Sequence, residues 1–413
     1  MRLFGLHNST DPIRLNWKDD INAENSLPPI DYAALVQYAK DTHQRHMKYA
    51  HNIECQLSDM YNIGGLHLVR LLDFGDGTTW LARLQLQKGT AASCQRLIAE
   101  VHTIQLVREK SNIRVPEVFS YDASCDNSVG DPFMLLEYIQ AITAMDSFGG
   151  WDKHKGRIPQ HFRTDYHASM ANIQVEIASI RFPMIGRIVK LSDGTFSIGE
   201  LPGIGGPFKT AAEFFCAWAD NSKFPYDENF IRERTSAAAV DEIISSIKGF
   251  PARLRDFARH YTFQNGPYPL IHSDLYSSNV LVDSQCRIKG VIDWENAIVG
   301  PWEIVEVIKD LSIVPRLLDG PFYREKQSDQ EMMADRKRYI QAIKEGERAS
   351  RVSETLDSWN TQNFAHAIWL YSDGRIGYYS RIFELFTEIN ARSSDQEALN
   401  IEMLKLRVRR QLF

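Results

Sequence analysis

The segment LIHSDLYSSNVLVDSQCRIKGVIDWENA, residues 270–297, combines side chains that could bind a metal ion. Within it, the β-like runs 280–283 and 287–292 predict two short strands joined by a tight turn. Because a hairpin brings its two ends together, Asn279 before the first strand and Asp293 after the second should lie at the same end. An amide oxygen and a carboxylate side by side make a hard-oxygen site suited to Mg²⁺.

Asp274 lies on the loop just before this hairpin, where its carboxylate could face a hydroxyl group. Asp274 and Asn279 have the spacing of the H-R-D-x-x-x-x-N catalytic loop. Phosphoryl transfer needs one carboxylate that orients the nucleophile and oxygen ligands that hold metal on the phosphates. The segment therefore predicts a phosphoryl-transfer site, in which His272 hydrogen-bonds the loop backbone. An aspartate that only caps a turn is the alternative for Asp274.

The segment resembles the motif H-x-D-x-x-x-x-N, followed by a hairpin and I-D-W, of the aminoglycoside phosphotransferase and choline kinase family. The chain is similar to fungal members of this family over roughly residues 50–310, with further matching stretches at 76–86, 113–122, 133–139 and 180–188. The resemblance implies an α+β, protein-kinase-like fold with a small β-rich N-terminal lobe and a larger, mainly helical C-terminal lobe. It also implies ATP and Mg²⁺ as cofactors, Asp274 as the catalytic residue, and Asn279 and Asp293 as metal ligands.

The resemblance further implies nucleotide-binding residues in the N-terminal part of the chain. A kinase-like site places a lysine on the third strand for the phosphates, and Arg83 occupies that position here. Arginine is permanently charged and binds phosphate oxygens through two donors. Leu81 shares a strand face with Arg83 and is expected to cover the adenine. We expect Glu100 to pair with Arg83, and the backbone groups of Glu137 and Ile139 to bind the adenine edge. A surface arginine and a solvated helix face are the alternatives for Arg83 and Glu100.

Up to residue 139 the pattern is mostly strands. The runs 66–74 and 78–86 flank Gly75-Asp76-Gly77 and predict a hairpin. Helices are predicted at 31–50 and 91–110, and the apolar run PFMLLEYI predicts a strand at 132–139. We therefore expect an N-terminal helical extension at 1–50, followed by a nucleotide-binding N-lobe of one antiparallel sheet and one helix at 51–139.

Beyond residue 139 helical patterns dominate. Helices are predicted at 160–180, 331–348, 353–371, 376–390 and 395–411, and a small hairpin around Ser192-Asp193-Gly194. We expect a C-lobe at 140–413, with the catalytic loop at 270–297 and a helical substrate region at 300–413. A cleft between two lobes is a preferred place for a ligand.

The composition excludes several classes of protein. The 413 residues carry a net charge of -6, and 44% of them are hydrophobic, which excludes disorder as the main state. The absence of a basic excess argues against a charge-driven nucleic-acid binder. No apolar run approaches the roughly 20 residues of a membrane span. Five scattered cysteines and an N-terminus without a secretory pattern favour a cytoplasmic protein without a disulfide framework or zinc site.

Three functions remain open. The leading hypothesis is an ATP-dependent O-phosphotransferase that acts on a small-molecule hydroxyl, with neither nucleic acid nor membrane as a partner. A protein kinase is disfavoured because D-F-G, A-P-E and V-A-I-K are missing. The alternative is a catalytically weak or inactive nucleotide-binding regulatory protein of the same fold. It is motivated by Arg83 in place of lysine and by Tyr276-Ser277-Ser278, which departs from the family's usual loop.

The resemblance implies that the helical lobe forms the acceptor pocket. From residue 321 onward acidic and basic side chains are nearly balanced, so the sequence shows no surplus of carboxylates for a polycationic acceptor. Candidate acceptor-binding residues in this region are Glu354, Asp357 and Asp373.

Overall fold

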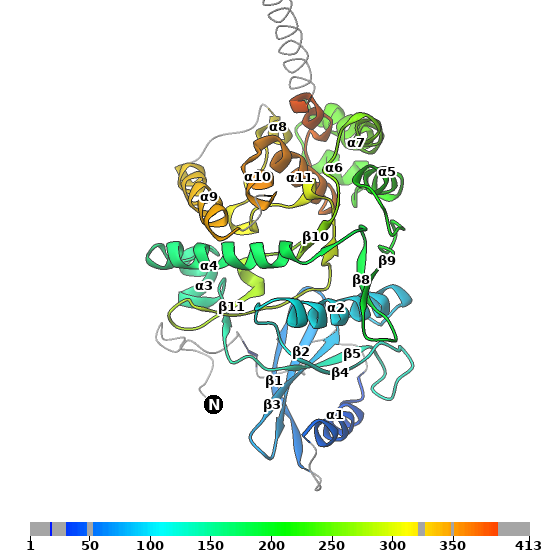
Figure 1. The fold of residues 1–413 in the computed structure, drawn as a ribbon, viewed down its shortest axis with the longest axis vertical. Helices are drawn as coiled ribbons and strands as arrows, with labels where there is room; N and C mark the ends of the chain where they lie inside the picture. The colour runs from blue at the N-terminus through cyan, green and yellow to red at the C-terminus, as the bar shows by residue number, and fades with distance from the viewer. Residues whose placement is uncertain (1–16, 19–29, 48–52, 321–326, 348–350, 387–413) are drawn as a thin grey trace, which may run out of the picture.

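The computed structural model has two lobes and describes residues 17–18, 30–47, 53–320, 327–347 and 351–386. A smaller lobe built on one sheet lies at one end of the molecule, and a larger, mainly helical lobe lies at the other (Figure 1). The sequence predicts an α+β, protein-kinase-like fold of this kind, and the structure confirms it.

The small lobe contains a five-stranded antiparallel sheet with strand order β1-β2-β3-β5-β4. Its strands are β1 (Cys55–Ile63), β2 (His67–Phe74), β3 (Thr79–Gln85), β4 (Val118–Asp122) and β5 (Phe133–Glu137). The predicted hairpin is β2 and β3, which place Val69 opposite Arg83. Its turn uses Gly77 at a φ of 87°, a left-handed conformation that glycine adopts without strain.

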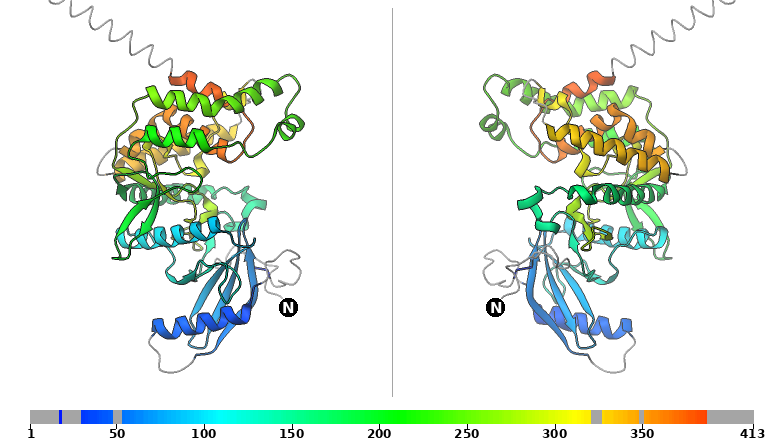
Figure 2. Two further views of the ribbon diagram at one scale, coloured as in Figure 1. Left: turned by 90° about the vertical axis from the view of Figure 1, so that its right-hand side faces the viewer. Right: turned by 90° about the vertical axis from the view of Figure 1, so that its left-hand side faces the viewer.

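Helices cover the two faces of this sheet. Helix α1 (Tyr32–Met47) packs Leu35 and Ala39 against the face that carries Trp80 and Ala82. Helix α2 (Ala91–Lys110) packs Leu97 and Val101 against Met134 and Leu136 of β5, on the other face. Side chains alternate along a strand, so Leu81 and Arg83 of β3 point to the face of α2. Figure 2 shows α2 next to the larger lobe and α1 away from it.

The larger lobe begins with a short strand and continues as helices interrupted by small sheets. Its first part contains β6 (Ile142–Thr143), η2 (Ser147–Gly149), α3 (Gly150–His154), α4 (Gln160–Ser179), β7 (Arg181–Phe182), β8 (Arg187–Lys190), β9 (Phe196–Gly199), α5 (Ala211–Asn221), α6 (Glu228–Arg234) and α7 (Val240–His260). The predicted helix at 160–180 is α4, and the predicted small hairpin is β8 with β9. Both predictions are confirmed.

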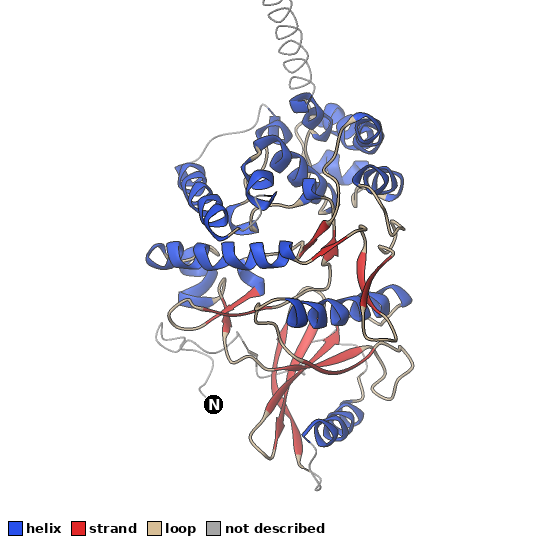
Figure 3. Ribbon diagram, viewed as in Figure 1, coloured by secondary structure: helices blue, strands red, loops and turns tan. Residues whose placement is uncertain are grey.

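The candidate catalytic segment is framed by two three-stranded sheets. Its elements are β10 (Tyr268–Ile271), η3 (Ser277–Asn279), β11 (Val280–Val282), β12 (Ile288–Val291) and β13 (Ile298–Val299). Strand β11 pairs with β12 and with β6, while β10 pairs with β13 and with β7. The predicted hairpin is therefore present with shorter strands, and its strand β11 also pairs with β6 (Figure 3).

The last part of the described chain differs from the prediction in its helix boundaries. It contains η4 (Trp302–Ile304), η5 (Lys309–Leu311), α8 (Arg316–Asp319), α9 (Gln327–Gly346), α10 (Arg351–Asp357), α11 (Trp359–Ser372) and η7 (Tyr379–Phe383). The single helix predicted at 353–371 is wrong, because Ser358 ends α10 and caps α11 by accepting the Thr361 amide at 3.3 Å. The helix predicted at 376–390 is largely a 3-10 helix within the described residues. The one predicted at 395–411 lies outside them.

The larger lobe has its own apolar core, in which Trp294 and Trp302 are fully buried. In the described part of the chain, no helix is long and apolar enough to span a membrane.

Candidate active site

The loop that follows β10 presents one exposed carboxylate, that of Asp274. Ser273 has a φ of 63°, and the Asp274 amide donates to the carbonyl oxygen of His272 at 2.8 Å, which makes a tight turn. The Asn279 Nδ2 donates to the Asp274 carbonyl at 2.9 Å and to its Oδ2 at 2.8 Å. Asn279 thus fixes the orientation of the Asp274 carboxylate and keeps its own Oδ1 for another partner.

His272 joins this loop to the turn that carries Asp293. Its Nε2 lies 3.0 Å from the Ile292 carbonyl oxygen, and its ring packs at 4.5 Å from the ring of the buried Trp294. Burial lowers the pKa of His272, so the ring is a neutral donor to that carbonyl. The contact is of the backbone-scaffolding kind that the sequence predicts for His272.

Asp293 follows β12 and lies beside Asn279 in the backbone. The Ile292 amide donates to the Asn279 carbonyl at 2.9 Å, so the two ends of the hairpin meet as expected. Asp293 has a φ of 65°, a left-handed conformation that costs a non-glycine residue of order 1 kcal/mol and is common at functional sites. Its carboxylate is 43% exposed and approaches Arg83, while the Asn279 amide faces Asp274.

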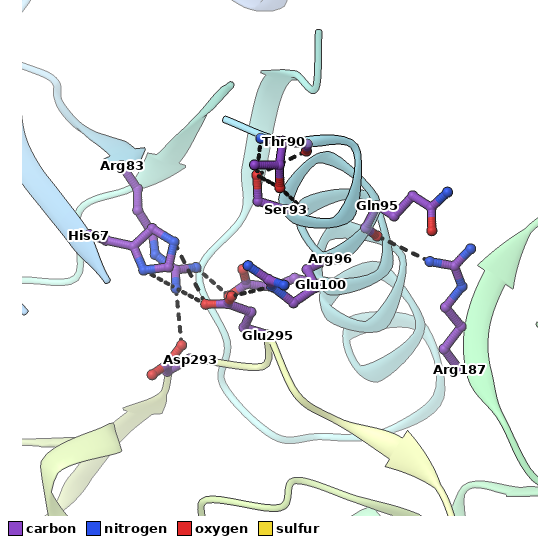
Figure 4. Close-up of polar contacts among 10 residues, drawn as sticks. All are labelled: His67, Arg83, Thr90, Ser93, Gln95, Arg96, Glu100, Arg187, Asp293 and Glu295. Carbon is purple, nitrogen blue, oxygen red and sulfur yellow. Dashed lines mark hydrogen bonds and ion pairs between the residues drawn. The ribbon is translucent and has the colours of Figure 1, made fainter. Parts of the chain in front are cut away.

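Arg83 of β3 lies at the centre of a charge network between the two lobes (Figure 4). Its Nη1 forms an ion pair with Glu100 of α2, and its Nη2 lies 3.0 Å from Asp293 Oδ1 and 3.4 Å from Glu295 Oε2. The Arg83 side chain is only 10% exposed. The structure therefore brings Arg83, Glu100 and Asp293 together and excludes the alternative of an exposed strand arginine.

Three carboxylates, those of Glu100, Asp293 and Glu295, contact this one guanidinium, and their proximity affects the pKa of Glu100. Burial raises the pKa of Glu100 to about 7; Arg83 opposes the shift, and the charges of Asp293 and Glu295 add to it. Burial also lowers the pKa of His67 to about 3, with Arg83 and Arg96 adding to the effect. His67 is therefore neutral, and its Nδ1 can accept from Arg83 Nη2 at 3.0 Å.

The model of the phosphotransferase enzyme family matches residues 64–304, which is more than half of the chain. The chain belongs to this family. The match includes β2 and β3 of the small lobe and the whole segment 270–297, so both sides of the Arg83 network lie within it. The family predicted from the motif is confirmed.

Solved structures with a similar chain include other phosphotransferases. A macrolide 2'-phosphotransferase type I is 14% identical, with 82% of this chain and 91% of that chain covered and a TM-score of 0.43. The apoenzyme of macrolide 2'-phosphotransferase MphH from Brachybacterium faecium is 15% identical, with coverages of 88% and 96% and a TM-score of 0.41. The AMP-bound spectinomycin phosphotransferase APH(9)-Ia is 13% identical, with coverages of 82% and 89% and a TM-score of 0.38. No curated protein matches the chain significantly.

The residues expected to contact adenine lie on β3 (Leu81), at the end of β5 (Glu137) and just after it (Ile139). Leu81 is half-buried against the apolar cluster between the sheet and α2. The Glu137 amide donates to the Glu117 carbonyl at 2.8 Å, so only its carbonyl oxygen remains for a nucleotide. The Glu137 side chain forms an ion pair with Arg114. The Ile139 side chain packs on Gly290 of β12. A Cβ added at Gly290 would lie only 2.9 Å from Ile139 Cδ1.

The sequence analysis missed several polar residues of this candidate site. Glu295 is 8% exposed and contacts Arg83, Arg96 Nε at 3.2 Å and His67 Nε2 at 3.6 Å. Its position two residues after Asp293 is a signal that could have drawn attention to it. His67 and Arg96 carry no such signal, because their role depends on how α2 and β2 meet the 293–295 turn.

Asp310 is a further missed residue, and it contacts the loop that carries Asp274. Its Oδ2 accepts the Ser277 amide at 3.1 Å, and burial raises its pKa to about 6 although the Ser277 hydrogen bonds oppose the shift. The sequence does not single it out, because Glu303 and Glu306 are also carboxylates of the segment 302–311. Asp310 thus satisfies a backbone donor of the loop that carries Asp274.

The donor set at the hairpin end suits a hard divalent cation. The Asn279 Oδ1 and the partly exposed Asp293 carboxylate are oxygen donors, and Glu295 lies close behind them. Such a set, completed by phosphate and water oxygens, is the type that binds Mg²⁺. Among the described residues, no group of three His, Cys, Asp or Glu side chains could hold a metal by itself.

Proposed function

We propose that the protein is an ATP- and Mg²⁺-dependent O-phosphotransferase that acts on a hydroxyl of a small molecule. The observation that carries the proposal is the exposed Asp274 carboxylate, oriented by Asn279, at the end of a hairpin whose other end places Asp293 against Arg83. In this proposal residues 51–139 bind the nucleotide and residues 140–413 supply the catalytic loop and the acceptor region.

In the proposed reaction Asp274 orients the acceptor hydroxyl. Asn279 occupies Asp274 Oδ2, so Oδ1 is the atom that accepts the hydroxyl hydrogen bond and takes its proton as the oxygen attacks the terminal phosphorus. The bond from phosphorus to the oxygen of the leaving diphosphate breaks in the same displacement. Hydrogen bonds of His272, Asn279 and Ser277 fix the turn that carries Asp274. The Asp274 carboxylate therefore needs to move little to reach its reactive position.

Arg83 is the proposed phosphate ligand. Its guanidinium is held in place by Glu100, and its Nη2 contacts Asp293, which is 43% exposed. We propose that Nη2 exchanges the Asp293 carboxylate for phosphate oxygens when nucleotide binds. Asn279 and Asp293 would hold Mg²⁺, which when bound neutralises charge on the phosphates. Leu81 and the backbone of Glu137 and Ile139 would then bind the adenine.

The surroundings of Asp274 in the larger lobe support a small acceptor. A cavity of about 220 Å³ lies beside the catalytic loop, between Tyr276, Lys309 and Asp335 of α9. Burial raises the pKa of Asp373; Lys309, which lines this cavity, opposes the shift, and the charge of Asp274 adds to it. Asp357 instead pairs with Lys344 at 2.8 Å and is 59% exposed. Asp373 is therefore the candidate of this region that we propose for acceptor binding.

The proposal is tested with Mg-ATP, a panel of hydroxylated metabolites and antibiotics, and an assay of ADP release. We expect Asp274→Ala to abolish transfer while nucleotide affinity stays within about threefold, because the residue contacts the acceptor rather than the nucleotide. Asp293→Ala should weaken Mg-ATP binding itself. Asp283→Ala is a matched control, because Asp283 lies on the turn of the same hairpin and pairs with Arg287 at 2.8 Å.

Two outcomes would contradict the proposal. Parent activity in both the Asp274 and Asp293 variants would show that the site is elsewhere. Tight Mg-ATP binding by the parent without turnover on any acceptor would instead favour the regulatory nucleotide-binding protein.

A further inference from the structure

Two cysteine side chains of the small lobe lie against each other. Cys94 belongs to the first turn of α2, and Cys125 belongs to the turn between β4 and β5. Their Sγ atoms are 3.2 Å apart although 31 positions separate them in the chain. Both are free thiols and half-buried. A disulfide has an S–S distance of about 2.05 Å, so the two sulfurs need to approach by only about 1 Å to form one.

The two segments that carry these thiols are tied together by other contacts. The Gly89 amide donates to Asp131 Oδ1 at 2.8 Å, and Lys88 Nζ donates to the Gly130 carbonyl at 2.6 Å. Thr90 caps α2 in a reciprocal arrangement with Ser93, which fixes the first turn of the helix. The juxtaposition of the thiols is therefore part of the lobe's architecture.

We propose that Cys94 and Cys125 form an oxidative modification site, at which a low-molecular-weight disulfide converts the two thiols into a reversible intramolecular disulfide. One thiolate attacks the small disulfide and releases one small thiol, which leaves a mixed disulfide on the protein. The second thiolate attacks the protein sulfur of this mixed disulfide and releases the second small thiol. Two protein thiols are oxidised and one small disulfide is reduced to two thiols, so electrons and protons balance.

The other three cysteines are less suited to this chemistry. Cys55 and Cys286 are buried, and burial raises the pKa of each thiol to about 12. Cys216 on α5 is half-buried, and among the described residues the close thiol–thiol contact is that of Cys94 with Cys125. Burial and the contact with Cys125 raise the pKa of Cys94 to about 11, so the reaction should accelerate with pH.

The disulfide would restrain α2, the helix whose side chains contact the proposed nucleotide site. Helix α2 carries Arg96 and Glu100 into the Arg83 network, and the thiols already meet in the arrangement where Glu100 reaches Arg83. Cross-linking should therefore hold α2 in this position and stabilise the small lobe. This inference rests on the geometry of the thiols and not on the proposed phosphotransferase reaction.

The test uses the whole 413-residue chain, treated with glutathione disulfide at pH 8.5 and compared with the reduced protein. We expect intact mass to show the loss of two hydrogen atoms, and peptide mapping to give a Cys94–Cys125 cross-linked peptide. Closing a loop of this length should raise the thermal midpoint by about 5 °C. Hydrogen exchange of the first turns of α2 should slow, and dithiothreitol should reverse all changes.

Matched variants separate the cross-link from other oxidation. Cys216→Ser should behave like the parent. Cys94→Ser and Cys125→Ser should each lose the thermal shift and retain one glutathione adduct on the remaining cysteine. The proposal is overturned if glutathione accumulates on Cys94 or Cys125 of the parent without a cross-linked peptide. It is also overturned if Cys94→Ser shows the same thermal shift as the parent.

Discussion

Arg83 Nη2 and Asp293 Oδ1 lie 3.0 Å apart, although 210 positions of sequence separate the two residues. One belongs to a strand of the small lobe and the other to the turn after the catalytic hairpin, so this contact joins the proposed phosphate ligand to the proposed metal ligand. The same guanidinium also contacts Glu100 and Glu295. Nucleotide affinity and its pH dependence should therefore depend on the ionisation of the carboxylates around Arg83.

Replacing Arg83 tests its role toward the phosphates. We expect Arg83→Met to weaken Mg-ATP binding by about tenfold to a hundredfold, because a charge-assisted hydrogen bond contributes about 1.5–3 kcal/mol. Arg83→Lys should retain part of the affinity, since it keeps the charge without the two-donor geometry. Isothermal titration measures both. Arg287→Met is the control, because Arg287 is 75% exposed on the hairpin turn. Equal loss in the control and in Arg83→Met would contradict the role of Arg83.

The raised pKa of Glu100 predicts a pH dependence of nucleotide binding. Above about pH 7 Glu100 is ionised and pairs with Arg83, and below it the pair is lost as the carboxylate takes up a proton. We expect Mg-ATP affinity to fall as pH decreases through about 7 in the parent, and this inflection to be absent in Glu100→Gln. Binding titrations from pH 5.5 to 8.5 measure the effect. An unchanged inflection in Glu100→Gln would assign it to another group.

The same group predicts an opposite trend in stability. The folded protein holds the Glu100 proton more tightly than the unfolded chain, whose reference pKa is 4.5. Its contribution to the free energy of unfolding is therefore fully present below about pH 4.5 and is lost as pH rises to about 7. Denaturant unfolding at pH 5 and pH 7.5 should show a smaller difference in Glu100→Gln than in the parent. A larger difference in the variant would contradict the assignment.

Glu295 should shift the pH at which Mg-ATP affinity changes. Its charge adds to the rise in the pKa of Glu100, so Glu295→Gln should move the inflection in Mg-ATP affinity to lower pH. Arg96→Gln is the matched comparison, because Arg96 contacts Glu295 at 3.2 Å and is 40% exposed. An inflection that moves upward in Glu295→Gln would show that Glu295 acts on the network in another way.

Asp310 should be needed for both stability and turnover. Asp310→Ala leaves the buried Ser277 amide without its acceptor, which should destabilise the protein by about 1–3 kcal/mol and lower kcat. Asp310→Asn keeps an acceptor and should recover most of the stability. Denaturant unfolding and ADP release measure the two effects, with Asp241→Ala as a surface control at 82% exposure. Full stability of Asp310→Ala would contradict a bracing role.

The sequence by itself determined the elements whose signals are local. The alternation on β3 places Leu81 and Arg83 on one face, and the spacing of Asp274, Asn279 and Asp293 identifies the hairpin and the family. These features follow from periodicity and turn chemistry over a few residues, so they can be read from one chain. The helix predicted at 353–371 failed because the capping side chain of Ser358 overrides helical propensity there.

Only the tertiary structure decided which charges share a site. Glu295, His67 and Arg96 come from three distant segments, and they meet because α2 and β2 pack against the turn after β12. The burial of Asp310 under the catalytic loop and the approach of Cys94 to Cys125 have the same origin. Such contacts depend on how lobes and loops pack, and no periodic pattern along the chain encodes them.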